Sequence, residues 1–184
     1  MMTMHTLHRI LFSLAALLIA GCSTVSSMPG SSPLDAGVKW VLLPMENHTD
    51  TPQAALSAES IAEHALRLRG IDNLVRYPAT LSRDSLFEPS ERRVTEDAQK
   101  WAREQGARYG LSGAVEEWRY KVGIDGEPAV GITLQVIELS SGQVVWSASG
   151  AKSGWSRDAL SGVAQKLLNE LLGGLRVQKN TDRR

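Results

Sequence analysis

The N-terminal segment constrains this chain more than any other part of the sequence. An apolar run from Ile10 to Ile19 is interrupted only by Ser13, and it follows a weakly basic start that ends at Arg9. The small pair Ala20-Gly21 closes the run directly before a cysteine. This order is typical of a secretory signal, and the run is too short to span a bilayer as a helix. We therefore expect residues 1–21 to be a signal peptide that is removed.

Cys22 follows this segment and is the single cysteine of the chain. The small residues before it resemble the lipobox of bacterial lipoproteins. That resemblance implies cleavage before Cys22 and acylation of its thiol, with palmitate among the attached chains. An ordinary signal peptide with an incidental cysteine, or a buried hydrophobic segment, is the alternative. In lipoprotein sorting an aspartate after the cysteine favours inner-membrane retention, so Ser23 implies the inner leaflet of the outer membrane, on its periplasmic face.

The lone cysteine also limits how the exported domain is stabilised. It has no partner for an internal disulfide, so the fold must be held by its hydrophobic core. The 20 basic and 20 acidic residues balance, which excludes the basic surplus of a nucleic-acid-binding protein.

We expect residues 22–37, rich in Ser, Pro and Gly, to be a lipidated flexible tether. Residues 38–175 are expected to form one α/β domain, and residues 176–184 a basic disordered tail.

Hydrophobic periodicity and turn residues divide the expected domain into strands and helices. A polar loop over residues 45–52 separates the first strand from the first helix. The order βαβαβββα predicts an α/β fold with a single mixed β-sheet and helices packed on it. Strands are predicted at residues 38–44, 73–77, 107–120, 130–139 and 143–149, and helices at residues 56–69, 95–105 and 156–172.

The first and last predicted helices each have one apolar face. The final helix has the broader apolar stripe, and we expect Ser156 to cap its start. In the first helix, Glu63 and Arg67 are expected to pair one turn apart. Its core-facing residues are predicted to be Leu56, Ile61, Ala65 and Leu68, and its solvent-facing residues Glu59, Glu63, Arg67 and Arg69. The core-facing stripe of the final helix is predicted to be Leu160, Val163, Ala164, Leu167, Leu168, Leu171 and Leu175.

Three blocks of the sequence carry a family resemblance. VKWVLLP followed by MENHT, then AREQGARYGLSGAVEEW, then ITLQVIELSSGQVVWSAS resemble the periplasmic lipoproteins with a TolB N-terminal-domain-like fold. Glu138 replaces the aspartate usual in the third block. This superfamily, which includes the CsgG-related lipoproteins, contains curli-secretion lipoproteins, peptidoglycan-synthase activators and the PelC family of Pel polysaccharide export.

The sequence distinguishes between these groups. It contains no alternating strands of the length needed for a membrane hairpin, which counts against the curli type. Its expected tether is shorter than the long linker of the synthase activators. The resemblance to the PelC family implies a homo-oligomeric ring beneath an outer-membrane exopolysaccharide porin, where it guides a cationic polysaccharide outward during biofilm formation. The alternative is a monomeric scaffold that docks and activates a cell-wall synthase or a secretion component.

The sequence shows no recognisable catalytic machinery. It has no GxSxG motif, no phosphate-binding loop and no pair of histidines at metal-ligand spacing. His48 lies between Glu46 and Asp50, a pattern more typical of a polar loop than of a metal site, and His64 is expected on a helix surface. We therefore predict that the protein is not an enzyme and binds neither a metal nor a cofactor.

Two features could serve anchoring or export. Trp155 precedes the expected cap, and either it packs on Leu160 as a hydrophobic staple or it exposes its indole at the membrane–water boundary. The acidic residues Glu116, Glu117, Asp125 and Glu127 surround the predicted meander. Singly they are solvated surface charges, but repeated around a ring they would line a negative passage for a cationic polymer. The sequence contains no residue-level marker of self-association.

Overall fold

The computed structural model describes residues 23–28, 32–78, 91–122 and 126–179. The expected signal peptide, Cys22, Asp125 and the last five residues of the expected tail lie outside the described residues. Within the described part, a six-stranded sheet has the strand order β1-β7-β6-β5-β3-β4, and β2 and β8 form a separate parallel pair. The sheet strands are β1 (Ser23–Met28), β3 (Trp40–Asn47), β4 (Leu74–Arg76), β5 (Tyr109–Tyr120), β6 (Pro128–Glu138) and β7 (Gln143–Ser153). The remaining elements are β2 (Leu34–Asp35), β8 (Val177–Gln178), α2 (Ala54–Leu68), α3 (Glu91–Glu104) and α4 (Leu160–Gly173).

The sheet is mixed because two kinds of connection build it. β3 pairs in parallel with both β4 and β5, and helical crossovers through α2 and α3 make these parallel neighbours possible. β5, β6 and β7 are joined as an antiparallel meander, and β1 adds to the free edge of β7. The predicted α/β fold with one mixed sheet is therefore confirmed, and the predicted order βαβαβββα is found from β3 to α4.

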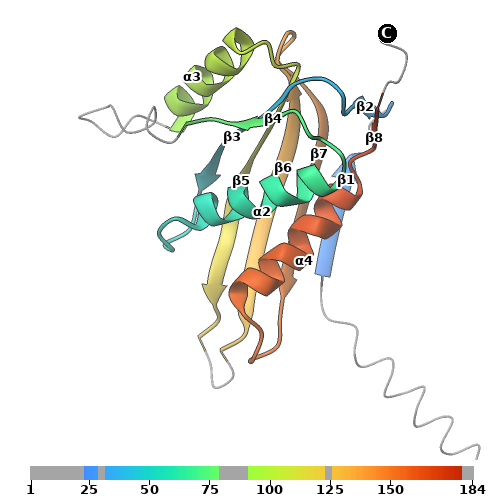
Figure 1. Cartoon of the computed structure of the whole chain (residues 1–184). Helices are drawn as coiled ribbons and strands as arrows, with labels where there is room; N and C mark the ends of the chain where they lie inside the picture. Colours follow the sequence, from blue (N-terminus) through green and yellow to red (C-terminus); the bar gives the residue numbers. More distant parts are fainter. Residues whose placement is uncertain (1–22, 29–31, 79–90, 123–125, 180–184) are drawn as a thin grey trace, which may run out of the picture.

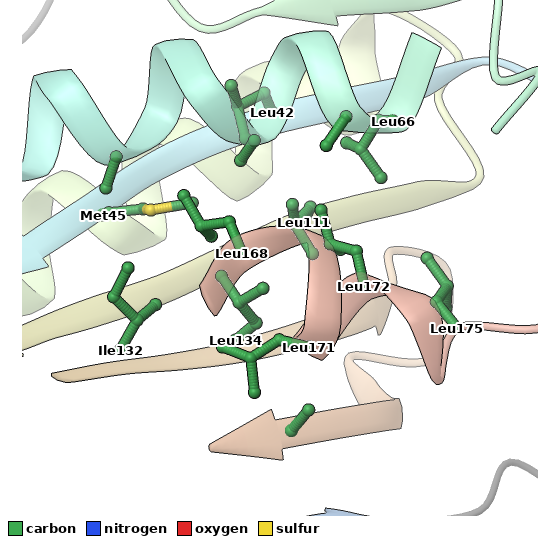
Figure 2. Packing of buried hydrophobic residues seen from close by; sticks show 14 of the residues in the cluster. Leu42, Met45, Leu66, Leu111, Ile132, Leu134, Leu168, Leu171, Leu172 and Leu175 are labelled. Carbon is green, nitrogen blue, oxygen red and sulfur yellow. The ribbon is translucent and has the colours of Figure 1, made fainter. Parts of the chain in front are cut away.

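The main core lies between the sheet and the pair α2 and α4, which cover the same face (Figure 1). Figure 2 shows leucines of α4, among them Leu168 and Leu171, packed against Leu134 of β6 and Leu111 of β5. Each fully buried side chain of this size contributes about 1.5–3 kcal/mol through the hydrophobic effect. The apolar stripe predicted for the final helix is confirmed from Val163 onward.

A smaller core lies on the opposite face of the sheet, at the end where β3 begins. α3 contributes Ala98 and Ala102, which pack on Val41 and Leu43 of β3 together with Ile137 of β6. Among the described residues, α3 covers that end of the face. The two faces of the sheet are therefore covered unequally.

The prediction of a flexible tether over residues 22–37 is wrong for much of that segment. Ser23–Met28 is paired along its full length with β7, and Leu34–Asp35 pairs with Val177–Gln178. The edge of β7 presents unpaired backbone groups, and a polar segment can satisfy them without contributing a buried side chain. The predicted disordered tail is likewise wrong at Val177–Gln178, and the predicted loop 45–52 is wrong at its start, because β3 continues to Asn47.

The inward face predicted for the first helix is also wrong at three positions. Leu56 and Leu68 are exposed, at 37% and 71%, whereas Glu59 is buried at 5%. A row of alanines, including Ala58 and Ala62, forms the buried face and brings α2 close to the sheet. Glu59 can lie on that face because Arg76 of β4 neutralises its charge. The predicted ion pair between Glu63 and Arg67 is confirmed, with a distance of 2.9 Å.

The last helix begins later than predicted. Its N-cap is Ala159, in an extended conformation and without a side-chain cap, so Ser156 does not cap it. Gly113 allows β5 and β6 to pack closely in the meander. A Cβ atom there would lie 2.2 Å from the backbone oxygen of Thr133 on β6.

Candidate membrane-facing end and acidic cleft

Strand pairing brings the residue after Cys22 to one end of the sheet. Ser23 is paired with Lys152 near the end of β7, and Tyr120 at the end of β5 is paired with Pro128 at the start of β6. The amide of Gly154 donates a hydrogen bond of 2.9 Å to the carbonyl oxygen of Pro128. The start of β1, the β5–β6 connection and the β7–α4 connection therefore meet at the lower end of the sheet in Figure 1. We call this the anchor end.

Large hydrophobic side chains are exposed at the anchor end. The exposed fraction is 67% for Trp155, 51% for Tyr120 and 104% for Val122. A compact turn holds the Trp155 backbone in place, because its amide donates to the Asp158 carboxylate at 3.1 Å and its carbonyl accepts from the Asp158 amide at 2.8 Å. The Tyr120 hydroxyl accepts a hydrogen bond of 3.1 Å from the amide of Leu160, the first residue of α4.

These contacts contradict one of the two predictions for Trp155. A hydrophobic staple requires Trp155 to lie one residue before the N-cap and to bury its ring against the helix. The N-cap is Ala159, and Trp155 is mostly exposed, so the staple on Leu160 is wrong. The exposed indole remains a candidate for contact with a lipid surface.

A cleft of about 450 Å³ lies on the sheet face opposite α2 and α4. It forms where β5 has a bulge between Val115 and Glu117, so that Glu116 is the extra residue. Loop residues after β3 close the other side, because β3 ends beside Val115 while its parallel neighbour β5 continues to Tyr120. We call it the acidic cleft. Its lining residues are His48, Thr49, Asp50, Thr51, Glu116, Glu117, Trp118, Arg119, Gly131 and Ala151.

The charges of the acidic cleft are partly compensated. A carboxylate oxygen of Glu116 lies 2.9 Å from Nδ1 of His48, whose Nε2 lies 3.2 Å from Glu46. Arg119 donates a hydrogen bond of 2.9 Å to Glu117. Three carboxylates and one guanidinium line the cleft, so its surplus is negative when His48 is neutral. These groups are about a third or more exposed, so each pair contributes little to stability.

The structure brings together part of the predicted acidic set. Glu116 and Glu117 share the cleft, whereas Glu127 is half-buried in the β5–β6 connection and does not line it. Asp50 also lines the cleft and His48 contacts β5, and neither was predicted from the sequence. A signal for both was available, because parallel pairing of the first and third predicted strands would place the loop after the shorter strand beside the longer one.

Three further findings concern chemistry and membrane insertion. His64 is exposed on α2, as predicted. In the described ranges, no three His, Cys, Asp or Glu side chains are arranged to hold a metal ion. None of the described helices combines the length and apolar character that crossing a bilayer requires.

Comparison with known proteins identifies relatives. Residues 79–151 match the family model described as peptidoglycan-synthase activator LpoB. No curated protein sequence matches the chain. The lipoprotein GNA1162 from Neisseria meningitidis has a TM-score of 0.53 at 16% identity, covering 72% of this chain and 94% of that one, and so shares the fold alone.

A solved structure gives the family. A PelC dodecamer from Paraburkholderia phytofirmans is 44% identical to this chain, with a TM-score of 0.73, and the alignment covers 86% of this chain and 100% of that one. A second PelC dodecamer from the same organism has the same identity and TM-score over 85% of this chain. This similarity shows that the chain belongs to the PelC family of lipoproteins.

Proposed function

We propose that this protein is a lipoprotein of the outer membrane that forms a homo-oligomeric ring and assists export of a cationic exopolysaccharide through a partner porin. The observation that carries the proposal is the 44% identity to PelC structures described as dodecamers. The role proposed is that of a non-catalytic accessory protein. The lipid anchor is proposed at Cys22, in the inner leaflet of the outer membrane.

The anchor end supports a fixed orientation of the domain on the bilayer. Because Ser23 is already paired in β1, a lipid on Cys22 would begin one residue from the folded sheet. Trp155 and Val122 are exposed at that same end. Indole rings favour the membrane–water boundary, and several acyl chains on one residue anchor far better than one. We infer that the anchor end lies on the membrane and that the strands run away from it.

The acidic cleft supplies the electrostatic part of the proposal. Glu116, Glu117 and Asp50 lie within reach of a polymer that passes along this side of the domain. Repeated around a ring, their fields would add and would attract amino-sugar cations while repelling anions. Screening limits such attraction to about 8 Å at physiological ionic strength, so the polymer must pass close to the cleft. The cationic exopolysaccharide is therefore proposed to contact this surface directly.

The test measures binding of partially deacetylated chitosan oligosaccharides, with fully N-acetylated oligosaccharides as the neutral comparison. Calorimetry on the detergent-solubilised lipoprotein is expected to detect the cationic ligand only, with affinity falling as salt rises. Glu116→Gln combined with Glu117→Gln is expected to weaken binding by roughly two- to thirtyfold, since each of the two exposed charge contacts is worth about 0.2–1 kcal/mol. Glu104→Gln, an exposed carboxylate on α3, is the matched control. Equal binding of neutral ligand, or affinity independent of salt, contradicts the proposal.

The alternative is a scaffold that docks and activates a cell-wall synthase. The partial match of residues 79–151 to the synthase-activator family model favours it. Light scattering after size-exclusion chromatography separates the two functions, because a closed ring supports export and a monomer supports docking. We favour export, because the dodecamer is a property of the relative that aligns with 86% of this chain.

A further inference from the structure

The β-bulge of β5 places two carboxylates next to each other in the acidic cleft. β5 has one residue more than β6 between Val115 and Glu117, and this extra residue is Glu116. Gly131 of β6 leaves room for both acidic side chains, because a Cβ atom on it would lie 3.4 Å from Cβ of Glu117 and 3.6 Å from Cβ of Glu116. Adjacent carboxylates repel each other, so a cation beside each of them stabilises the charged pair.

The two carboxylates have different kinds of partner. Glu117 accepts a hydrogen bond of 2.9 Å from Nε of Arg119, and a guanidinium stays charged throughout the pH range of proteins. Glu116 instead lies 2.9 Å from Nδ1 of His48. The charge of an imidazole changes near its ordinary pKa of about 6.5. One carboxylate therefore has a permanent cation beside it, and the other has a cation that depends on pH.

His48 lies between carboxylates of two different strands. Its Nδ1 faces Glu116 of β5, and its Nε2 lies 3.2 Å from an oxygen of Glu46 on β3. The backbone amide of His48 donates a hydrogen bond of 3.0 Å to the carbonyl oxygen of Val115, which holds this residue beside the bulge. A neutral imidazole has one N–H donor, whereas an imidazolium has two. Only the protonated ring can donate to both carboxylates.

The other charged groups around His48 come from β3, from the loop that follows it and from β5. They are Glu46, Asp50, Glu116, Glu117 and Arg119. Carboxyl groups ordinarily titrate near pH 4, and guanidinium groups above about pH 12. Imidazole is therefore the group type among those described here whose charge changes between about pH 5.5 and about pH 8.5.

Protonation of His48 changes the charge that the acidic cleft presents. With a neutral His48, three carboxylates and one guanidinium leave a surplus of two negative charges, and an imidazolium reduces this surplus to one. The imidazolium also occupies an oxygen of Glu116 that a ligand cation would contact. The side chains of His48 and Glu116 are 41% and 48% exposed, so solvent screens the effect and keeps it modest.

We propose that His48 is a proton-dependent counter-ion that determines the affinity of the acidic cleft for cations. When protonated, it binds Glu46 and Glu116 and weakens cation binding. When it loses its proton to the solvent, it releases one of these carboxylates and the cleft binds cations more tightly. This inference rests on the proposed function, because it concerns the same cationic ligand. It predicts that the affinity rises with pH, opposite to the effect of a ligand amine, which loses its charge as pH rises.

The test uses a cation whose own charge does not depend on pH. A fully N-trimethylated chitosan oligosaccharide carries quaternary ammonium groups, which have no proton to lose. Calorimetry on the detergent-solubilised full-length lipoprotein is expected to show an affinity about two- to fivefold higher at about pH 8.5 than at about pH 5.5, the effect of one exposed charge contact. Near the ordinary imidazole pKa of about 6.5, titrations in two buffers of different ionisation enthalpy should show that binding releases a fraction of a proton.

Substitutions of the two described histidines assign the effect. His48→Gln removes the titrating charge, and His48→Arg makes it permanent. Both are expected to bring the ratio of the two affinities close to one and to abolish proton release, and the arginine variant should bind more weakly than the glutamine variant. His64→Gln, at an exposed position on α2, is the matched control and is expected to keep both the ratio and the proton release. Circular dichroism at both pH values measures folding.

The outcomes separate this inference from the proposed function. A wild-type protein that does not bind the quaternary cation at either pH would overturn both. Salt-dependent binding with the same pH ratio in the wild type and in both His48 variants would overturn only the role of His48, and so would tighter binding at the lower pH. If a His48 variant unfolds, proton release by the wild type and by His64→Gln decides the matter, because binding without proton release contradicts the inference.

Discussion

The buried carboxylate of Glu59 links α2 to the parallel part of the sheet. Removing the Arg76 cation that neutralises this carboxylate gives a quantitative prediction for the stability of the domain. One oxygen of Glu59 accepts a hydrogen bond of 2.9 Å from the amide of Met45, and the other accepts from Nε of Arg76 at 3.1 Å. The Glu59 side chain is 7% exposed and that of Arg76 is 32% exposed. The substitution Arg76→Met keeps the aliphatic stem but leaves the carboxylate buried without its cation.

The expected loss in the free energy of unfolding follows from the burial of Glu59 and Arg76. Removing one partner of a buried ion pair costs about 3–5 kcal/mol, because the remaining charge is left uncompensated. Arg76 is partly exposed, and Glu59 keeps the Met45 amide, so we expect the lower end, about 3 kcal/mol. For a chain of this size the melting temperature would fall by roughly 6–12 °C.

Two further variants test whether the uncompensated charge of buried Glu59 causes the loss of stability. The double variant Arg76→Met/Glu59→Gln removes the buried charge and should recover part of the loss, because a neutral amide can still accept from Met45. Glu63→Gln breaks an exposed ion pair on the same helix and should change stability by only about 0.2–0.5 kcal/mol. Thermal and urea unfolding followed by circular dichroism, at one protein concentration, measure all variants. A loss under about 0.5 kcal/mol for Arg76→Met, or a double variant less stable than Arg76→Met, would refute the reasoning.

Three other predictions concern the anchor end, β1 and the core. Trp155→Ala should weaken binding to liposomes without unfolding the domain, whereas Leu68→Ala, which removes a similarly exposed side chain from the opposite end of the domain, should leave liposome flotation unchanged. Gly150→Ala should release β1, because the new Cβ would lie 2.7 Å from the backbone oxygen of Thr24; hydrogen exchange should show the β1 amides losing protection while those of β6 keep it. Burial raises the pKa of the Tyr109 phenol above its ordinary value, so the unfolded chain ionises first, and stability should be lost as pH rises above about 10. Tyr109→Phe should reduce this alkaline loss in urea titrations, and an unchanged pH slope would contradict the assignment.

Periodicity predicted the elements that form the bulk of the core. The stripe of α4 is continuous and broad, so its buried residues from Val163 to Leu171 could be assigned without knowledge of the partner surface. The α2 face could not, because alanines, which give a weak hydrophobic signal, form the contact. Glu59 reads as a surface residue until Arg76, 17 residues later in the chain, lies beside it.

Polar edge strands are the other part of the fold that the sequence did not predict. Ser23–Met28 has little hydrophobic pattern, and its pairing depends on the free backbone groups of β7. Such pairing uses main-chain hydrogen bonds that any non-proline residue can provide, so composition carries almost no signal for it. The same holds for the short pair β2 and β8.

By itself, the sequence determined the family, the expected anchor at Cys22 and the order of the central elements, because these depend on local motifs and on periodic burial. Only the tertiary structure placed Ser23 at the same end as Trp155, joined His48 to Glu116, and packed the described helices α2 and α4 on one side of β1, β7 and β6. The physical reason is that strand register and sheet order bring together residues far apart in the chain, and neither is encoded in any single segment.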